Sequence, residues 1–452
     1  MELNKQFIDD IKRTMPLAQA SLLIEAITSE PPVTATRYND AKGFTPPQEL
    51  DKVPWCETGA YLSERPRFAL DPHFHAGSYF VQDASSMFIY HVLKTLVTKP
   101  VTYLDLCAAP GGKTTAALQA LPEGSTVVAN EIMPQRAQIL RENVIKWGAC
   151  NCLVSCDSPA AVGSLHSAFD VIAADVPCSG EGMFRKDTEA VSQWSPSLVE
   201  QCSRRQRQVI GDVWSALKPE GLLIYSTCTF NIHENEEIVD FIVNELGASV
   251  VDVAIQEQWG ISPAIDRAYS CYRFMPHATR GEGLFMCVMR KHHSSIATST
   301  TKRTTQKSKK SCPPPTIASS VNRWVNINHS LLQVNDKIIA VPEFVNPLVA
   351  TWQNTLHVIK TAGIELGTLK GNKVVPSHQL AMSPHRAPGL FTEVDLDYPT
   401  ALSYLRGEAL TIDAPRGYVA VKHDNATLGW VNNLGPRANN LYPKPWRLRT
   451  SH

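Results

Sequence analysis

The sequence predicts an α/β protein built around a doubly wound parallel sheet. From Val101 onward, short apolar runs alternate with longer helix-forming runs, an order typical of a parallel sheet with helices on both faces. The first apolar run, residues 102–106, ends in a turn of small residues that opens directly into a helix. Such a turn at the carboxyl end of a strand lets the backbone approach a ligand closely. We therefore expect a ligand site at this edge of the sheet.

The other elements of the sheet follow in order along the chain. Residues 91–291 are expected to form this domain, and two late apolar runs, 272–275 and 284–290, suit antiparallel edge strands. The remaining predicted strands cover residues 126–130, 152–155, 171–174 and 222–226, and the predicted helices cover residues 113–121, 134–147, 197–217 and 235–246.

A small α+β region that contacts RNA is expected before the sheet, over residues 1–90. Two short amphipathic helices are predicted at residues 7–15 and 17–27, and a proline-rich stretch of turns and extended segments follows them. The candidates for contact with nucleic acid in this region are Tyr38, Asn39 and Lys42.

Three segments are expected after the sheet. Residues 292–320 are rich in Ser, Thr, Lys and Pro and predict a flexible linker, because this composition forms no core. Residues 321–390, with apolar runs at 324–341 and 359–366, predict a small intermediate domain. Residues 391–452 predict a mainly β domain with a turn at Asp424-Asn425.

Basic and aromatic residues interleave near the C-terminus, a mixture that suits RNA backbone contact and base stacking. An ordinary surface tail is the alternative. The residues concerned are Arg437, Tyr442, Lys444, Trp446, Arg447 and Arg449.

The net charge of the 452 residues is zero, but the charge is unevenly distributed. From Ser294 onward the chain has 18 Lys and Arg against 9 Asp and Glu, whereas the part before it has 25 against 34. A basic third joined to an acidic body indicates a module that binds a polyanion. The alternative is a basic solvated linker, because much of the excess lies between Lys302 and Lys310.

The eleven cysteines are irregularly spaced, which is typical of reduced thiols and places the protein in the cytoplasm. The densest group, Cys150, Cys152 and Cys156, has no matching pair at zinc spacing and is more typical of a strand, so we expect no metal. No apolar run reaches the roughly 18 residues of a membrane span, and residues 1–15 do not resemble a signal peptide. The sequence leaves the oligomeric state open, with a monomer favoured.

The turn after the first strand runs from Cys107 to Lys113 and contains Gly111 and Gly112. A nucleoside triphosphate loop needs a glycine where Cys107 stands, and a nicotinamide fingerprint needs a third spaced glycine. A site for S-adenosylmethionine (SAM) is the third interpretation, and a tight turn without a ligand is the fourth. We expect a side chain at Gly111 or Gly112 to intrude on the ligand.

Acidic residues and thiols follow the other predicted strands. Glu131 follows the second strand, where a carboxylate suits ribose hydroxyls, although a surface carboxylate at a helix start is the alternative. Asp157 follows the third strand, where its carboxylate could contact the edge of an adenine ring. Cys178 and Cys228 follow the fourth and fifth strands, which are expected to be neighbours. Two thiols in one cleft favour chemistry over packing, with ordinary buried cysteines as the alternative.

Three segments resemble the SAM-dependent RNA cytosine-5 methyltransferases of the NOL1/NOP2/Sun family. They are Asp105-Leu106-Cys107-Ala108-Ala109-Pro110-Gly111-Gly112-Lys113, Asp175-Val176-Pro177-Cys178-Ser179-Gly180 and Ser226-Thr227-Cys228-Thr229. The resemblance covers roughly residues 1–291 and implies a Rossmann-like class I methyltransferase core. The linker and basic C-terminal region resemble those of the family's bacterial 16S rRNA members, which implies a PUA-like RNA-binding domain at residues 391–452.

The resemblance implies a covalent mechanism. Carbon 5 of cytosine is a poor nucleophile until a thiolate adds to carbon 6. Cys228 is implied to be that nucleophile, Cys178 to help release the product, and Asp175 to hydrogen-bond the ring nitrogen. The family usually has Asp where Glu131 stands. The residues implied to bind SAM are Cys107, Ala108, Ala109, Pro110, Gly111, Gly112, Lys113, Glu131, Asp157 and Asp175.

The implied function is methyl transfer from SAM to carbon 5 of a specific cytosine in 16S rRNA, within the small ribosomal subunit. The alternatives are the same chemistry on tRNA, large-subunit rRNA or DNA, and a non-catalytic RNA-binding factor of ribosome assembly. DNA enzymes use the Pro-Cys thiol as the nucleophile, and the presence of Asp175, Cys178 and Cys228 favours catalysis. The sequence leaves open which nucleotide is modified, and whether the substrate is naked rRNA or an assembled subunit.

Overall fold

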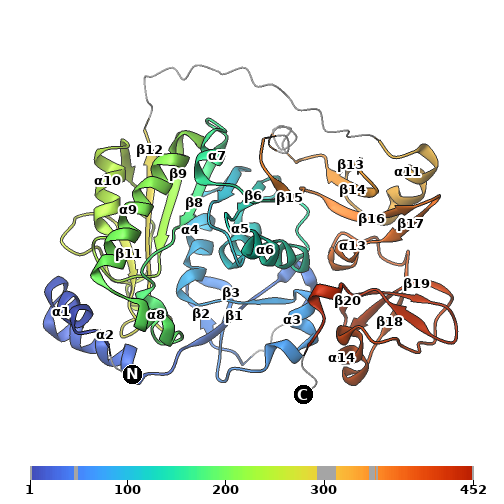
Figure 1. Ribbon diagram of the computed structural model, residues 1–452, viewed down its shortest axis with the longest axis horizontal. Helices are drawn as coiled ribbons and strands as arrows, with labels where there is room; N and C mark the ends of the chain where they lie inside the picture. The colour runs from blue at the N-terminus through green and yellow to red at the C-terminus, as the bar shows by residue number, and fades with distance from the viewer. Residues whose placement is uncertain (1–2, 45–48, 293–311, 346–351, 353–354, 450–452) are drawn as a thin grey trace.

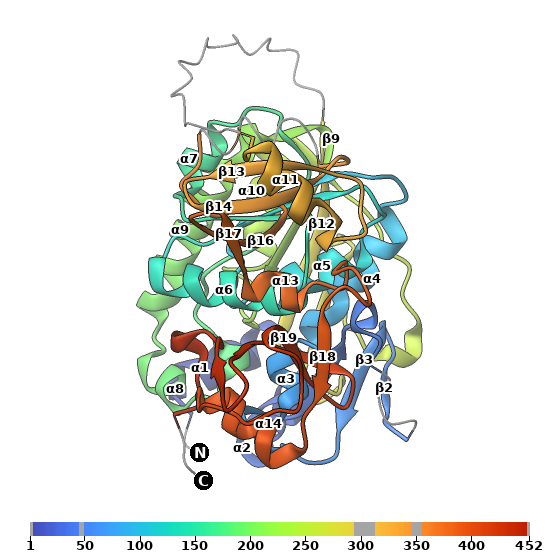
Figure 2. The ribbon, with the colours of Figure 1, turned by 90° about the vertical axis from the view of Figure 1, so that its right-hand side faces the viewer.

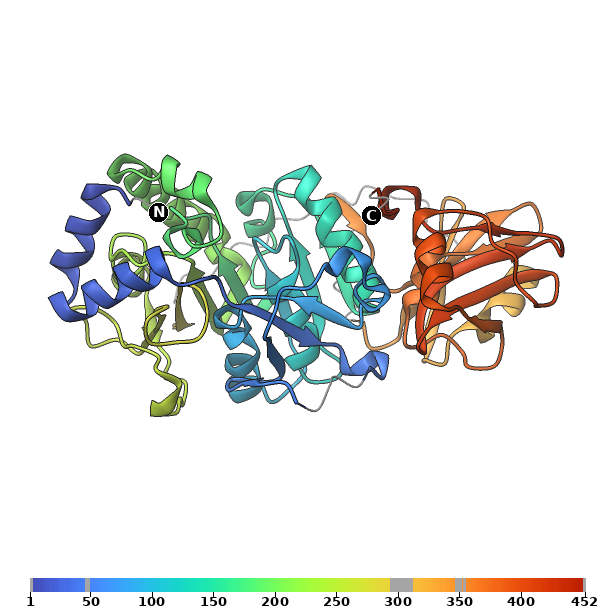
Figure 3. The same cartoon turned by 90° about the horizontal axis from the view of Figure 1, so that it is seen from below.

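The structure of the protein is a computed structural model that describes residues 3–44, 49–292, 312–345, 352 and 355–449. Seen from below, the N-terminal helices lie at one end, the large sheet lies in the middle, and the C-terminal strands lie at the other end (Figure 3). The predicted fold class, an α/β core with an α+β region before it and a mainly β domain after it, is confirmed.

The core is one sheet with the strand order β10-β12-β9-β8-β5-β6-β7-β15. Strands β9, β8, β5, β6 and β7 are parallel, and Asp175 on β8 is level with Ser226 on β9. The core strands are β5 (Thr102–Asp105), β6 (Thr126–Asn130), β7 (Cys152–Ser155), β8 (Phe169–Asp175), β9 (Leu217–Thr227), β10 (Ala248–Val250), β11 (Cys271–Phe274) and β12 (Leu284–Lys291).

Alternating residues of the strands bury opposite faces of this sheet. Tyr103 and Val127 face helices α4, α5 and α6, whereas Leu104 and Val128 face α7, α9 and α10. Because both faces are covered, the parallel strands are apolar throughout rather than alternating with polar residues. The helices are α4 (Phe88–Leu96), α5 (Gly112–Ala120), α6 (Pro134–Trp147), α7 (Pro159–Gly163), α8 (Thr188–Gln193), α9 (Pro196–Val213) and α10 (Glu236–Asn244).

The two late strands are antiparallel as predicted, but the expectation that both lie at the edge is wrong. Strand β12 pairs with β9 on one side and with β10 and β11 on the other. Its residues from Leu284 to Met289 are buried, so it is an inner strand. The sequence prediction missed β10, whose three residues are too short to show a periodic pattern.

A segment from beyond the linker completes the other edge of the core sheet. Strand β15 (Val358–Lys360) pairs with β7, and Trp352 packs on Phe169 with ring centroids 5.0 Å apart. Residue 359 was expected in the intermediate domain, so the placement of the 359–366 run in one small region is wrong. An edge strand exposes unpaired backbone groups, and β15 satisfies those of β7.

The N-terminal region has two helices and an antiparallel sheet of order β2-β3-β1-β4, which lies below the core in Figure 1. Buried Arg37 on β1 joins it to the core, donating to Gln82 at 3.0 Å and to the Gly112 carbonyl at 3.3 Å. The elements are α1 (Lys5–Thr14), α2 (Leu17–Ser29), β1 (Thr34–Tyr38), β2 (Lys52–Val53), β3 (Cys56–Leu62), α3 (Pro72–Ala76) and β4 (Tyr79–Val81).

Two four-stranded sheets follow the linker and lie on one side of the core (Figures 1 and 2). The first sheet comprises β13 (His329–Val334), β14 (Lys337–Pro342), β16 (Ile364–Lys370) and β17 (Lys373–Pro376), with helices α11 (Pro315–Val321) and α13 (His378–Met382). The second comprises β18 (Thr392–Asp395), β19 (Gly417–His423), β20 (Ala426–Asn433) and β21 (Ala438–Asn440), with helix α14 (Tyr398–Arg406).

One local prediction for the C-terminal region is confirmed, and one element differs from the prediction. The predicted turn between β19 and β20 is confirmed, and both Asp424 and Asn425 have positive φ, as a tight hairpin requires. Helix α11 begins at Pro315, inside the segment predicted as a linker, and its Ile317 and Val321 are buried. Most of the predicted linker lies outside the described residues, and the predicted domain boundaries stay a prediction.

Candidate active site

The carboxyl ends of the parallel strands bring the candidate residues to one edge of the sheet. Strand β5 leads into the glycine turn, β6 into Glu131 and β7 into Asp157. Strand β8 ends at Asp175 and β9 ends at Thr227, each directly before a cysteine loop. The topology thus gathers residues that are more than 120 positions apart in the chain, from Cys107 to Cys228.

The two cysteines of these loops are in contact. The sulfur atoms of Cys178 and Cys228 lie 3.3 Å apart, and both residues are partly exposed. The hydrogen bond to Cys228, together with burial, raises the pKa of Cys178 well above its ordinary value. Cys178 therefore keeps its proton at neutral pH, and its S–H can donate to the sulfur of Cys228.

Asp175 lies at the end of β8, where Lys113 and Ser226 both bind its carboxylate. The Lys113 Nζ donates to Oδ2 at 2.8 Å, and the Ser226 hydroxyl donates to Oδ1 at 2.8 Å. Burial acts to lower the pKa of Lys113, but the ion pair with Asp175 outweighs it and raises that pKa. Asp175 thus faces the site as a carboxylate in a fixed orientation, with about a third of its side chain exposed.

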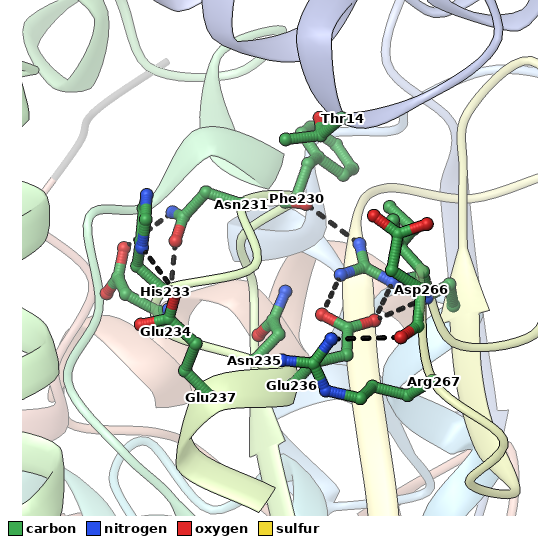
Figure 4. Close-up of polar contacts among 12 residues, drawn as sticks. Thr14, Phe230, Asn231, His233, Glu234, Asn235, Glu236, Glu237, Asp266 and Arg267 are labelled. Carbon is green, nitrogen blue, oxygen red and sulfur yellow. Dashed lines mark hydrogen bonds and ion pairs between the residues drawn. The ribbon is translucent and has the colours of Figure 1, made fainter. Parts of the chain in front are cut away.

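A buried polar network holds the two cysteine loops together. Glu234 Oε2 accepts from the Ser179 N–H at 3.0 Å and from Gln206 Nε2 at 2.9 Å. Asn231 Nδ2 donates to Glu234 Oε1 at 2.8 Å and to Glu181 Oε1 at 3.0 Å, and Figure 4 shows Asn231 and Glu234 facing each other across the turn. Glu181 and Glu234 therefore fix the cysteine loops to each other.

Sequence reasoning missed this network. Burial raises the pKa of Glu234 to about 7, and a carboxylate this well buried persists only when it is fully hydrogen-bonded. The sequence does contain a signal for the network, because its polar residues lie close to the two cysteines. Glu181 follows Cys178 by three positions, and Asn231 and Glu234 follow Cys228 by three and six.

The turn after β5 is held by backbone and side-chain hydrogen bonds. Gly111 has φ of 114°, a conformation that favours glycine, and caps the N-terminus of α5. Arg136 donates to the Ala109 carbonyl at 2.9 Å, and Asn143 donates to the Pro110 carbonyl at 2.8 Å. The turn therefore keeps a fixed shape and leaves the first N–H groups of α5 at the strand edge.

A side chain at Gly112 would point toward the N-terminal region. A Cβ at this position would meet Gln82 and Phe80 of the N-terminal region at 3.4 Å. The expectation that a side chain at Gly112 would intrude on a ligand is therefore wrong, because its Cα–H points into the protein. Gly111 is constrained by its φ and by Leu140, whose side chain lies 3.2 Å from the position of a Cβ.

The acidic residues after β6 and β7 lie where a nucleoside would bind at the strand edge. Glu131 is almost fully buried, and its Oε2 accepts no hydrogen bond among the described residues, although Arg136 lies 3.3 Å away. A buried carboxylate oxygen without a donor suits ribose hydroxyls. Asp157 is partly buried, and its Oδ2 accepts from the backbone N–H of His357 at 2.9 Å. These residues fit SAM.

Three family models match the chain. The model described as 16S rRNA methyltransferase RsmB/F matches residues 96–290. The N-terminal domain of 16S rRNA methyltransferase RsmF matches residues 3–84, and the methyltransferase RsmF PUA domain matches residues 391–448.

The chain belongs to the RsmB/F methyltransferase family.

Two curated relatives of this RsmB/F family member carry the name ribosomal RNA small subunit methyltransferase F. The one from Serratia proteamaculans is 34% identical over 252 residues, and the match covers 54% of this chain and 52% of the relative. The one from Shewanella loihica is 27% identical over 482 residues, covering 98% of this chain and 95% of the relative. The second match extends over the sheet, the linker and the C-terminal strands alike.

A solved structure shares the fold of the RsmB/F core. The structure of NSun6 from Pyrococcus horikoshii with SFG, a SAM analogue, has a TM-score of 0.54 and 20% identity. It covers 64% of this chain and 99% of the other. At this identity the likeness supports the methyltransferase fold alone.

The N-terminal residues predicted to contact nucleic acid have structural roles in this family member. Tyr38 and Asn39 are buried, and Asn39 donates to the carbonyls of Gly77 and Trp147. Lys42 donates to the carbonyl of Met382, and burial lowers its pKa to about 7. The expectation that these three side chains meet nucleic acid is wrong, because Asn39 and Lys42 join this region to its neighbours and the Tyr38 ring packs on Phe44 and Tyr79 inside it.

The C-terminal basic and aromatic residues divide into two groups. Tyr442 is buried against Tyr404 and Trp446, with its hydroxyl 3.3 Å from His75 Nδ1, so its expected role in base stacking is wrong. The other aromatic residue, Trp446, is partly exposed. The exposed basic residues are Arg437, Lys444 and Arg449, and Arg447 is partly exposed.

Among the described residues, no group of three or more His, Cys, Asp and Glu is placed to hold a metal ion. Cys152 lies in β7, as the strand interpretation predicted. In the same part of the chain, every helix is too short or too polar to span a bilayer.

Proposed function

We propose that this protein transfers a methyl group from SAM to carbon 5 of a cytosine in 16S rRNA, through a covalent adduct between Cys228 and carbon 6. The observation that carries the proposal is the 3.3 Å contact between Cys178 and Cys228 beside the Lys113–Asp175 ion pair. Two thiols, a carboxylate and a cation at one strand edge supply a nucleophile, a proton carrier and an oriented acceptor.

The first step is addition of Cys228 to cytosine. The sulfur forms a bond to carbon 6, the thiol proton is lost, and the ring nitrogen N3 gains a proton. The new N3–H donates to Asp175, whose carboxylate Lys113 and Ser226 already hold in place. Addition turns the ring into an enamine, and carbon 5 becomes nucleophilic.

SAM bound on the glycine turn would supply the methyl group that carbon 5 accepts. The turn residues 107–113 and Glu131 would hold it, with backbone N–H groups at the start of α5 and Oε2 of Glu131, which accepts no hydrogen bond among the described residues, as its polar contacts. Asp157 would lie at the adenine end, because it follows β7 at the same strand edge.

The last step restores both thiols. The bond between carbon 6 and the Cys228 sulfur breaks, and the Cys178 S–H gives its proton to the leaving sulfur. As that bond breaks, the electron pair of the C5–H bond forms the C5=C6 double bond, the carbon 5 proton passes to the Cys178 sulfur, and N3 releases its proton to water. The raised pKa of Cys178 suits this role, because a thiol that is protonated at neutral pH can donate first and accept afterwards.

The substrate follows from the family and from charge. The models and relatives are named for 16S rRNA and for the ribosomal small subunit, and the basic residues on the C-terminal sheets suit an RNA backbone. A target base inside folded RNA must be unstacked to reach Cys228. We place the reaction in the cytoplasm and at the small ribosomal subunit.

The proposal is tested with the full chain, tritiated SAM and three separate RNAs: 16S rRNA, 23S rRNA and total tRNA. Transfer of tritium to 16S rRNA alone is expected, and bisulfite sequencing of that RNA should show one protected cytosine. Transfer of tritium to tRNA or 23S rRNA instead would show that 16S rRNA is not the substrate. A Glu131→Gln variant with unchanged affinity for SAM would remove the ribose assignment.

A further inference from the structure

A cavity lies between the N-terminal sheet and helix α6. It has a volume of about 190 Å³. We call it the α6 cavity. Its main lining residues are Phe74, Tyr79, Phe80, Asn143, Lys146 and Trp147.

One wall of the α6 cavity is a free strand edge. Strand β4 pairs only with β1 among the described strands. The hydrogen bonds from Gln82 N–H to Ala35 O and from Asn39 N–H to Ser78 O set the alternation of this ladder. The peptide groups of Tyr79 and Val81 therefore point away from β1, toward the open side of the strand. Both residues line the cavity, which thus offers backbone donors and acceptors.

Another wall combines aromatic rings with a cation. Lys146 Nζ lies 5.7 Å from the ring centroid of Phe74 and 5.1 Å from that of Trp446. Burial lowers the pKa of Lys146 below its ordinary value. Trp446 belongs to the C-terminal segment that carries exposed Lys444 and Arg449. The cavity's lysine therefore contacts the basic segment directly.

We propose that the α6 cavity holds one unpaired base of the RNA substrate. The proposal rests on the function proposed above. Drug-sized ligands need roughly 300–1,000 Å³, so a cavity of about 190 Å³ takes one planar ring system. A nucleobase presents a face for aromatic stacking and an edge for hydrogen bonds. Phe74 could stack on the face of the base, and the free backbone groups of β4 could hydrogen-bond its edge. Lys146 could bind the adjoining phosphate.

The α6 cavity also touches the proposed SAM turn. Asn143 lines the cavity and donates to the carbonyl of Pro110 at 2.8 Å. A bound base would therefore lie one side chain away from the turn. This position separates it from the target cytosine, which must reach Cys228 at the ends of β8 and β9.

The first test locates the RNA. The full chain is bound to a 16S rRNA transcript, irradiated with ultraviolet light, and digested for mass spectrometry. A nucleotide attached to Phe74, Tyr79 or Phe80 is expected. Attachment confined to other elements would overturn the proposal and leave the free β4 edge to a protein segment.

The second test separates stacking from charge. Phe74→Ala should weaken binding of the 16S rRNA transcript about tenfold, as loss of one stacked base implies, without changing the salt dependence. Lys146→Met should also weaken binding and should lower the slope of log affinity against log salt by about 1, the value expected for loss of one phosphate contact. Lys94→Met is the matched control, because Lys94 lies 5.6 Å from the Tyr90 ring on α4, away from the cavity.

Folding is checked by thermal unfolding and by SAM affinity, which both variants should retain. Unchanged RNA affinity and slope in the two folded variants would overturn the proposal. The two proposals fail separately. A wild-type chain that crosslinks through the cavity but transfers no methyl group contradicts only the proposed function. Methyl transfer without a cavity crosslink contradicts only the α6 cavity assignment.

Discussion

The sulfur atoms of Cys178 and Cys228 lie 3.3 Å apart, although 50 positions separate the two residues in the sequence. The parallel pairing of β8 with β9 makes Asp175 level with Ser226, and each cysteine follows this level by two or three residues. The contact is therefore a product of register, and the buried Glu181–Asn231–Glu234 network holds it.

The proposed roles of the two cysteines predict different failures. Cys228→Ala should bind SAM and RNA but neither methylate nor crosslink, because no bond to carbon 6 can form. Cys178→Ala should form the bond and release it slowly. Denaturing electrophoresis should then show a protein–RNA band that nuclease removes, and the double variant should lack it.

The reverse result would exchange the two roles. A stable band in Cys228→Ala and none in Cys178→Ala would make Cys178 the nucleophile. Methylation retained by Cys228→Ala would contradict a covalent mechanism through this residue. Cys202→Ala, on the neighbouring helix α9, is the matched control and should behave as the wild type.

The two glycines of the turn should respond differently to alanine. Gly111→Ala places a side chain at φ of 114° with Leu140 at 3.2 Å, which should cost about 1–3 kcal/mol of stability and lower SAM affinity. Gly112→Ala meets Gln82 and Phe80 only at 3.4 Å, so its unfolding midpoint should stay close to that of the wild type. Equal losses in thermal unfolding and calorimetry would contradict the distinction.

Glu234 should make the stability depend on pH. Burial raises its pKa from the ordinary 4.5 to about 7, so the folded state holds a proton that the unfolded state releases. Stability should therefore be greatest below about pH 4.5 for this group and fall as the pH rises through 7, by up to about 3 kcal/mol.

Denaturant unfolding between pH 5 and 8 measures this effect. Glu234→Gln should flatten the profile, while Glu200→Gln, whose side chain is 69% exposed, should leave it unchanged. Part of the slope should remain in Glu234→Gln, because burial also raises the pKa of Asp105 to about 7. An identical profile in wild type and Glu234→Gln would contradict the assignment.

The basic C-terminal surface should contribute a salt-dependent part of RNA affinity. Replacing exposed Arg437, Lys444 and Arg449 with alanine should lower the slope of log affinity against log salt by about 0.7–0.9 for each lost phosphate contact. Arg204→Ala with Arg205→Ala, two exposed residues of α9, is the control. A filter-binding titration that gives equal slopes for both sets would make the C-terminal charge irrelevant to RNA.

The segment beyond the linker should stabilise the core. Trp352→Ala removes a buried ring from Phe169 and should destabilise the chain by about 3–5 kcal/mol. His357→Pro removes the N–H that donates to Asp157 and should weaken SAM binding, whereas His357→Ala keeps that N–H and should bind normally. Equal SAM affinity in the two folded variants would exclude a role for this hydrogen bond. Truncation after Arg290 would remove both contacts.

The sequence by itself determined the core fold and the identity of the strand-end residues. Alternating apolar and helical runs define a parallel sheet with covered faces, and parallel strands bring their carboxyl ends to one edge. Short periodic signals are therefore enough to place Cys178, Cys228 and Asp175 at one edge of the sheet. The tight turn at Asp424-Asn425 is also determined by local sequence, because Asp and Asn tolerate the positive φ that both positions of the turn require.

Only the tertiary structure decided which side chains are free. Asn39, Lys42 and Tyr442 have the residue types of an RNA surface, yet each is held by a partner far along the chain. Tyr38 is likewise buried, against Phe44 and Tyr79. The direction of Gly112, the docking of β15 on β7 and the Glu234 network depend likewise on long-range packing. The physical reason is that composition and periodicity encode local conformation and burial on average, whereas the partner of a given side chain is fixed only when distant segments pack together.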